Sequence, residues 1–269
     1  MKEFVPTFPT TYQISCMTIA ERHKYILEQL KEVGTVKVIE LAEQMKVSLV
    51  TIRKDLKVLE DRGTLYRSHG SASLRDMFVN DRSVFEKQQL NFEEKQAIAK
   101  KAVEMVTPGE AIIIGSGTTA RYFAEALPQE MDLTVLTSAL NVALVLMARP
   151  NIELIQLGGV VRKNASAVVG PVAEHMISQF ACSKLFLGVD GLSLDHGLST
   201  TNLLEAQLNK AMIQSAQKTI ILCDSSKISQ RGFARICDVK DADVLVTDQH
   251  IRASFVRSLE ESGISVWLS

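Results

Sequence analysis

The segment GSGTT, residues 115–119, holds side chains that are well suited to binding an anion. It follows the apolar run AIIIG and opens a helical pattern. Small residues there let backbone N–H groups approach an anion at the positive end of a helix, and the hydroxyls of Ser116, Thr118 and Thr119 can add further contacts. The same residues could also form only a tight strand-to-helix turn. The segment by itself leaves both interpretations open.

Other polar segments follow further apolar runs, namely TSALN at 137–141, LGGVVRKNASAVVG at 157–170, GVDG at 188–191 and DSSK at 224–227. Arg162, Lys163 and Lys227 supply cations there. Asp190 and Glu205 supply carboxylates that could hydrogen-bond sugar hydroxyls. These segments favour ligand binding over a simple turn at residues 115–119.

The elements that must position these residues are indicated by an alternation of apolar and helical segments. The apolar runs are AIIIG, LTVLT, IELIQLGG, KLFLGVDG, TIILCD, DVLVTD and ISVWL. This alternation is typical of a doubly wound, mostly parallel α/β sheet. In such a sheet ligands bind at the carboxyl ends of the strands, which is where the polar segments fall.

A second candidate site lies in SLVTIRKDLKVLEDRG, residues 48–63. At about 100° per residue, one side of the predicted helix carries Leu49, Ile52, Leu56 and Leu59. The opposite or flanking sides carry Val50, Thr51, Lys54 and Lys57, with Arg53 on the border. Ser48 offers an N-cap hydroxyl, and Gly63 ends the helix. The helix is therefore predicted to have one core face and one cationic face.

The surrounding residues predict a winged helix-turn-helix. Helical patterns occur in AERHKYILEQLKEVG and VKVIELAEQM, and TLYRSHGSASL predicts a hairpin that turns near His69 and Gly70. In this arrangement the third helix enters the DNA major groove, where Arg and Lys reach guanine or phosphate and a Thr methyl reaches thymine. The charges could instead merely solvate a surface helix. The agreement between helix, turn and wing favours DNA.

Two further residues of this region are given roles. Arg67 and His69 on the wing are expected to contact phosphates or the minor groove. Asp55 is expected to be structural and to orient a neighbouring basic side chain.

Composition supports a division into two parts. The chain has 269 residues and a formal net charge of −1, yet residues 17–75 hold eleven Lys or Arg against eight Asp or Glu, which is +3, so the remainder sums to −4. A basic module on an acidic body suggests a polyanionic partner for the module. We expect residues 1–16 to be a disordered extension, 17–75 the DNA-binding domain, 76–92 a linker and 93–269 the α/β domain.

Several classes of protein are disfavoured. The cysteines at 16, 182, 223 and 237 form no C-x-x-C pair and have no nearby His cluster, so no disulfide framework or zinc site is expected. No cofactor is indicated. No apolar run is long enough to span a bilayer, and the N-terminus lacks a secretory pattern. A reducing cytoplasm and no membrane partner are expected.

The region around residue 50 resembles a known family. Ser48, Thr51, Ile52, Arg53, Lys54, Asp55 and Leu56, followed by Gly70, are similar to the S-x-x-T-I-R-[RK]-D-L pattern and wing of the DeoR family of bacterial transcription regulators. Gly70-Ser71 departs from the family's usual glycine pair. The resemblance extends over residues 17–269 and implies a sensor domain like ribose-5-phosphate isomerase.

The resemblance also implies roles for individual residues. Ser116, Thr118 and Thr119 would hold a phosphate, Asp190 and Glu205 would face the sugar, and Lys210 and Lys227 would line the pocket. Glu205 and Lys210 could equally be surface residues of their helix. The candidate effector residues are Ser116, Gly117, Thr118, Thr119, Ser138, Asn141, Arg162, Asp190, Glu205, Lys210 and Lys227.

Two classes of function follow, a ligand-responsive repressor and a sugar-phosphate isomerase with a DNA-binding appendage. An isomerase needs a carboxylate base to move a proton between adjacent carbons. Here Leu192-Ser193 replaces the enzyme's acidic cluster after Asp-Gly, and its glycine-rich lysine loop is absent. A repressor that binds double-stranded operator DNA and a phosphorylated sugar is favoured. Because one helix-turn-helix covers few base pairs, a homodimer or homotetramer is expected.

Overall fold

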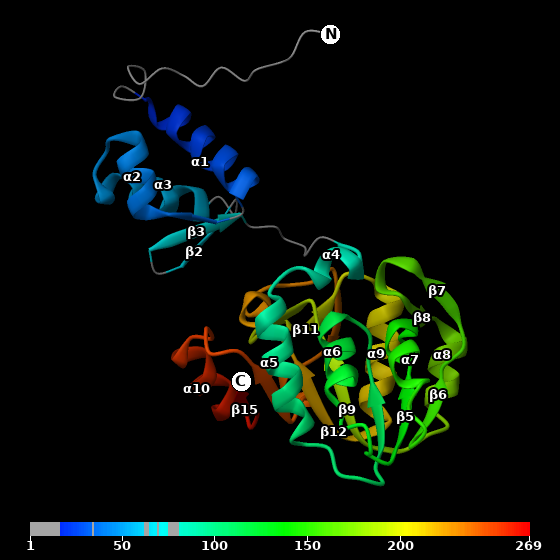
Figure 1. The fold of residues 1–269 in the computed structure, drawn as a ribbon. Coiled ribbons are helices and arrows are strands. Elements are labelled where there is room, and N and C mark those ends of the chain that lie inside the picture. The colour runs from blue at the N-terminus through cyan, green and yellow to red at the C-terminus, as the bar shows by residue number, and fades with distance from the viewer. Residues whose placement is uncertain (1–16, 34, 62–64, 69, 75–80) are drawn as a thin grey trace. The chain divides into compact units, whose positions relative to one another are not determined.

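The computed structural model describes residues 17–33, 35–61, 65–68, 70–74 and 81–269, and the chain divides into two compact units, Met1–Asp76 and Met77–Ser269 (Figure 1). We call them the N-terminal and C-terminal units. The predicted extension 1–16, the helix-ending Gly63 and the wing residue His69 lie outside the described residues.

The N-terminal unit is a winged helix-turn-helix, as predicted. Its elements are α1 Ile19–Val33, β1 Thr35–Lys37, α2 Val38–Met45, α3 Leu49–Asp61, β2 Leu65–Ser68 and β3 Ser71–Leu74. The strands form an antiparallel sheet in the order β1-β3-β2, so the predicted hairpin gains a third strand. Gly70 has φ +80°, a conformation that glycine adopts without strain in the turn between β2 and β3.

The core of this unit follows the predicted helical faces with one exception. Residues from all three helices and both hairpin strands are buried together, including Ile26, Leu30, Leu41, Met45, Ile52, Leu56, Leu59, Leu65 and Ala72. Leu49 was predicted to join them but is 40% exposed. It is the first residue of α3, and helical side chains lean toward the N-terminus, so its side chain is directed past the packed helices.

The C-terminal unit is built on a seven-stranded sheet in which every neighbouring pair is parallel. In spatial order the strands are β15 Ser265–Leu268, β14 Val244–Thr247, β12 Ala216–Leu222, β9 Cys182–Gly188, β4 Ala111–Ile114, β5 Leu133–Thr137 and β6 Ile152–Gln156. These are the seven apolar runs of the sequence, so the predicted doubly wound sheet is confirmed. The helices around it are α4 Val84–Gln88, α5 Phe92–Val103, α6 Thr118–Ala126, α7 Leu140–Leu146, α8 Pro171–Ile177, α9 Leu203–Gln214 and α10 Ala253–Glu261.

The strand order defines where a ligand is expected to bind. The chain starts in the sheet at β4, runs outward through β5 and β6, then returns to β9 on the other side of β4. Helices that follow β4 and β9 therefore lie on opposite faces, and the carboxyl ends of these two strands are where a ligand is expected to bind in a sheet of this kind. Residues 115–119 follow β4 and Asp190 follows β9.

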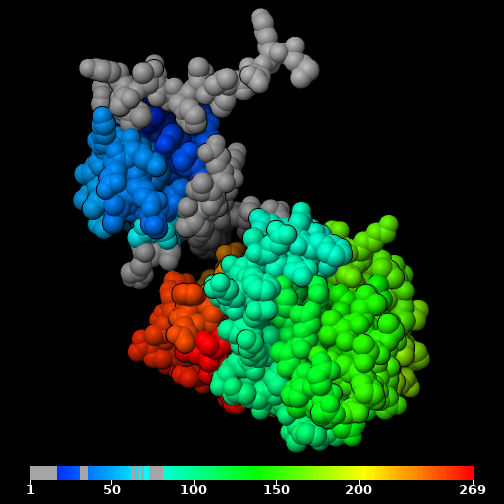
Figure 2. Space-filling view, in the orientation of Figure 1, coloured from blue at the N-terminus to red at the C-terminus, as the bar shows by residue number. Residues whose placement is uncertain are grey.

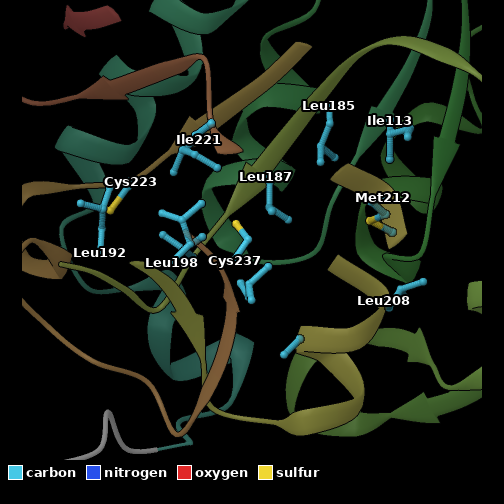
Figure 3. Close-up of a cluster of buried hydrophobic side chains, with 14 of the residues drawn as sticks. Ile113, Leu185, Leu187, Leu192, Leu198, Leu208, Met212, Ile221, Cys223 and Cys237 are labelled. Atoms are coloured by element: carbon cyan, nitrogen blue, oxygen red, sulfur yellow. The ribbon is translucent and has the colours of Figure 1, made fainter. Parts of the chain in front are cut away.

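Both faces of the sheet are covered by apolar side chains. Ile112 and Ile114 pack into one cluster with α5, α6 and α7, whereas Ile113 packs into the other with α8, α9 and α10. This alternation reflects the two-residue period of a strand. Figure 3 shows part of the second cluster, with Leu185, Leu187 and Ile221 from the strands of the sheet and Leu208 and Met212 from α9.

Two smaller sheets were not predicted. The hairpin of β7 Val160–Arg162 and β8 Ala167–Val169 is one, and the other orders β10 Gly191–Ser193, β11 Gly197–Thr200 and β13 Ala234–Cys237. Cys182, Cys223 and Cys237 are free and buried, and burial raises the pKa of the Cys237 thiol to about 12. These cysteines serve as small apolar side chains. No helix within the described ranges is long and apolar enough to cross a lipid bilayer.

Residues 76–92 were predicted to be a linker, but from Asp81 onward this segment is part of the C-terminal unit. Residues 84–88 form α4, whose N-terminus carries a capping box between Ser83 and Glu86. Lys87 and Asn91 then bond to Asp190 and Asp224 of the C-terminal unit. Polar side chains that bond to residues elsewhere in the same C-terminal unit account for the order of a segment with weak apolar periodicity. Residues 81–92 lie at the surface of this unit, in cyan in Figure 2.

Candidate effector site and DNA-binding surface

The segment after β4 forms a glycine-capped helix start. Gly117 is the N-cap of α6 with φ +110°, and Thr118 and Thr119 occupy the first turn with buried side chains. Within the described residues, no side chain caps this N-terminus. A Cβ on Gly115 would lie 2.8 Å from Leu187 Cδ1, so glycine lets β4 and β9 meet closely here. The first-turn N–H groups can therefore receive an anion.

Ser116 was expected to hold phosphate, but in the structure its hydroxyl has another partner. Ser116 Oγ donates to Glu205 Oε1 at 2.9 Å. Glu205 lies in the first turn of α9, where its backbone N–H donates to the N-cap side chain of Asn202 at 3.2 Å. Ser116 thus positions a carboxylate beside the helix start.

Glu205 continues into a chain of ion pairs. Arg162 Nη1 lies 3.3 Å from Glu205 Oε2, and Arg162 Nη2 lies 2.5 Å from Asp81 Oδ1. Asp81 also accepts hydrogen bonds from Asn164 Nδ2 at 3.1 Å and Thr201 Oγ1 at 2.9 Å. The chain of contacts links α9, the β7–β8 hairpin and the segment before α4.

Asp190, at the end of β9, is held by a second set of donors. Lys87 Nζ lies 2.6 Å from Asp190 Oδ1, and Thr200 Oγ1 donates to Oδ2 at 3.0 Å. Burial would raise the pKa of Asp190, but the charges of Lys87 and Lys227 and these hydrogen bonds outweigh it and lower the pKa. Asp190 is therefore an ionised carboxylate that accepts donors.

The neighbouring carboxylate behaves in the opposite way. Burial and the negative charge of Asp190 raise the pKa of Glu205, although Arg162 and Ser116 oppose that rise. Asp190 raises the pKa of Glu205, and the charge of Lys87 acts on both carboxylates, so we treat these residues and their partners as one group. We call it the charged cluster, and its members are Asp81, Lys87, Arg162, Asp190, Glu205 and Lys227. The cluster holds equal numbers of cationic and carboxylate side chains. An anionic group of a polar ligand could therefore replace a carboxylate beside one of the cations, and its hydroxyl groups could donate to the carboxylates.

The other predicted effector residues differ in position. Ser138 is buried after β5, and its carbonyl accepts from Val168 N at 2.8 Å. Asn141, on α7, has a buried Oδ1 with no hydrogen-bond partner in the described part of the chain. Lys227 ends the 3-10 helix Ser225–Lys227 and acts on Asp190.

Lys210 does not join the charged cluster. It is exposed on α9, and its charge acts on Cys237 of β13. Lys210 lies five positions after Glu205, which is about 140° around the axis at 100° per residue, so the two side chains leave the helix on different sides. In the structure Lys210 has the alternative surface position, apart from the charged cluster.

Sequence reasoning missed several residues of the site. They are Asp81, Lys87, Asn164, Thr200 and Thr201. The pattern Ser83-x-x-Glu86 is a capping-box signature that could have revealed α4 and so drawn attention to Lys87. Nothing in the local sequence links the others. Among the described residues, no group of three or more His, Cys, Asp or Glu side chains could hold a metal ion.

The predicted recognition helix presents its cations to solvent. Ser48 Oγ accepts from Thr51 N at 3.1 Å, which confirms the N-cap. Arg53, Lys54 and Lys57 of α3 are exposed, and Val50 is 58% exposed. Ile52, Leu56 and Leu59 face the core. The helix therefore has the two faces that a major-groove reader needs.

Two charged contacts brace this helix. Asp55 is buried and accepts from Arg22 Nε at 2.7 Å, with His23 Nε2 at 3.3 Å, so its partners come from α1. The expected structural role of Asp55 agrees with this pairing. Arg67 of the wing pairs with Glu60 at 2.8 Å and donates to the Arg53 carbonyl at 3.2 Å. Arg67 thus joins wing and helix, a role the sequence did not indicate.

Comparisons with known proteins identify the family. A model of the DeoR C-terminal sensor domain matches residues 90–249, and one of the DeoR-like helix-turn-helix domain matches residues 22–77. The chain belongs to the DeoR family. It is a transcriptional repressor of that family rather than an enzyme.

Individual relatives match over nearly the whole chain. The HTH-type transcriptional regulator YulB of Bacillus subtilis is 34% identical over 93% of this chain and 96% of its own. The regulator GlpR of Haloferax volcanii is 32% identical, covering 93% and 98%. The glycerol-3-phosphate regulon repressor of Escherichia coli K12 is 30% identical, covering 94% and 100%.

Among solved structures, ribose 5-phosphate isomerase A of Methanocaldococcus jannaschii aligns with a TM-score of 0.39 and 21% identity. The alignment covers 52% of this chain and 56% of the enzyme. The chain thus spans little more than half of that enzyme's length.

Proposed function

We propose that this chain represses a carbohydrate-metabolism operon and is released from its operator by a phosphorylated sugar. The observation that carries the proposal is the helix start at Thr118 and Thr119, which lies at the strand-order reversal beside the charged cluster. A phosphate would accept from the first-turn N–H groups, while Asp190 and Glu205 would accept from sugar hydroxyls. The name of the glycerol-3-phosphate regulon repressor agrees with a small phosphorylated effector.

On the DNA side, the exposed face of α3 is the reader. Arg53 and Lys54 would contact base edges or phosphates, and Val50 and Thr51 would contact thymine methyl groups. Lys57 would bind phosphate, and Ser48 fixes the start of the helix. Arg67 would hold the wing against the duplex. The repressor would act in the cytoplasm, together with its operator DNA.

The repressor would act as a homodimer or homotetramer. One winged helix-turn-helix reads a short half-site, and symmetric pairing of two half-sites supplies the remaining specificity. Light scattering of the free protein and of its operator complex measures this directly. A monomer in both samples would contradict the proposal.

The central test is a variant of the helix start. Thr119→Leu places a bulky side chain in the first turn of α6, so it should block phosphate while leaving the DNA-binding unit intact. Operator-bound wild type and variant would be titrated with pentose, hexose, amino-sugar and polyol phosphates in a gel-shift series. The variant should still bind operator but fail to release it.

The matched control is Thr107→Leu, at an exposed position before β4. Since linkage is reciprocal, operator DNA should also weaken sugar-phosphate binding by the same factor, typically about 5–150-fold. Release of the Thr119→Leu variant at the wild-type effector concentration would place the site elsewhere.

A milder variant tests the cationic side of the site. Lys227→Ala removes one charge-assisted contact, so effector affinity should fall by roughly 1.5–3 kcal/mol, measured by calorimetry with the inducing compound. Lys240→Ala, at an exposed position near β13, is the control. Equal affinities for these two variants would remove Lys227 from the site.

A further inference from the structure

The Asp81 carboxylate is bound by three hydrogen-bond donors of the kinds that form anion-binding sites. A guanidinium from Arg162, an amide from Asn164 and a hydroxyl from Thr201 converge on one carboxylate, at 2.5, 3.1 and 2.9 Å. Arg162 and Asn164 come from the β7–β8 hairpin and Thr201 directly follows β11, and they lie 81, 83 and 120 residues after Asp81 in the sequence. Planar guanidinium with amide and hydroxyl donors is a combination that suits carboxylate and phosphate equally.

The burial of the two partners is unequal. The Arg162 side chain is 13% exposed, whereas the Asp81 side chain is 43% exposed. Arg162 also forms an ion pair with Glu205, in which Arg162 Nη1 lies 3.3 Å from Glu205 Oε2. Arg162 thus forms the fixed half of the ion pair, and Asp81 is the half that can leave toward solvent and exchange for water at modest cost.

The segment that carries Asp81 is anchored from Val84 onward, where the Val84 side chain is buried. Lys95 is buried and donates to the carbonyls of Lys87 and Leu90, at 2.6 and 2.5 Å, and Tyr122 Oη donates to the Gln88 carbonyl at 3.2 Å. These bonds hold residues 87–90. Asp81 and Arg82 are exposed and precede these anchors, so they can move without loss of them.

We propose that Arg162, Asn164 and Thr201 form an anion subsite, that Asp81 occupies it as an internal ligand, and that an anionic group of the effector displaces Asp81. The inference deepens the proposed function, on which it rests for the role of Arg162. Because the helix start at Thr118 and Thr119 receives one phosphate, this subsite takes a second anionic group, either a carboxylate or another phosphate. The effector is then a phosphorylated sugar acid or a sugar bisphosphate.

The subsite is tested with inorganic phosphate as the probe, in full-length protein carrying Thr119→Leu so that the helix start does not contribute. Asp81→Ala should raise phosphate affinity about tenfold, the equivalent of one charge-assisted hydrogen bond, as measured by the phosphate-dependent rise in thermal midpoint. Asp132→Ala removes an equal charge from an exposed position and should leave phosphate affinity unchanged. Adding Asn164→Ala and Thr201→Val to Asp81→Ala should abolish the gain. Phosphate affinity that is unchanged by Asp81→Ala, or a gain that survives loss of Asn164 and Thr201, would overturn the subsite.

The class of effector is tested with glucose 6-phosphate, 6-phosphogluconate and glucose 1,6-bisphosphate on protein with Thr119 intact. Asp81→Ala should strengthen binding of the two doubly anionic compounds and not that of glucose 6-phosphate. Equal gains for all three would overturn the requirement for a second anion. A wild-type protein that no sugar phosphate releases from operator would instead refute the proposed function, and the inorganic phosphate result would stand apart from it.

Discussion

The cations of α3 and those of the charged cluster are used in opposite ways. Arg53, Lys54 and Lys57 stand exposed on one helix, whereas Lys87 and Arg162 are mostly buried and bound to carboxylates. Exposed cations meet DNA phosphates at little desolvation cost and respond to salt. A buried cation that is paired with a carboxylate becomes available only to a ligand whose own anionic group takes the place of that carboxylate. The first arrangement suits a long polyanion, and the second suits selection of one small molecule.

The DNA-binding unit also contains one buried ion pair, between Asp55 and Arg22, which is an exception to its otherwise exposed charges. Asp55→Ala would leave Arg22 without its carboxylate, and Arg22 is only 12% exposed. Removal of one partner of a buried pair costs about 3–5 kcal/mol, so this unit should unfold at markedly lower denaturant concentration. Circular dichroism during denaturant unfolding measures the loss.

The control for that prediction is Asp61→Ala, which removes an equal charge from an exposed position at the end of α3. Equal stability of the Asp55 and Asp61 variants would show that the pair to α1 contributes nothing. The buried and exposed charges would then not differ in the way the comparison requires.

The exposed cations can be separated into base readers and phosphate binders. Lys54→Ala should cost about 1–3 kcal/mol on the operator and relax base preference, because a base contact is lost. Lys57→Ala should weaken all sequences alike and reduce the slope of log affinity against log salt by about 0.9. Fluorescence anisotropy on operator and random duplexes at several salt concentrations distinguishes them. If both variants lost the same affinity for operator and random duplexes and had the same salt dependence, the distinction between base readers and phosphate binders would be wrong.

The smallest effect concerns Glu205 and pH. Burial and the Asp190 charge raise the pKa of Glu205, so its protonated form is favoured on folding. Its contribution to stability is present below the ordinary carboxyl pKa and is lost as pH rises through the folded-state value. Glu205→Gln should therefore raise the thermal midpoint relative to wild type near neutral pH, and the difference should vanish at low pH. A difference that persists in acid, or that Glu261→Gln at an exposed position reproduces, would contradict this account.

Much of the fold follows from local patterns. The alternation of apolar runs and helices predicted all seven strands of the sheet, because a buried parallel strand must be apolar on both faces. The two faces of α3 and the Ser48 cap were likewise predictable, since the period of 3.6 residues and one hydroxyl suffice to specify them. The helix start at Thr118 and Thr119 was found because its residues are contiguous in sequence.

Tertiary structure alone decided the charged cluster. Its members come from before α4, from α4, the β7–β8 hairpin, the end of β9, α9 and the loop after β12, so no spacing in the sequence relates them. Lys210 shows the same limit, because a shared helix did not imply a shared face. Segment 81–92 was predicted as a linker because the partners that order it, Asp190, Arg162 and Asp224, are distant in sequence. Local pattern determines which elements form, and the packing of those elements determines which charges meet.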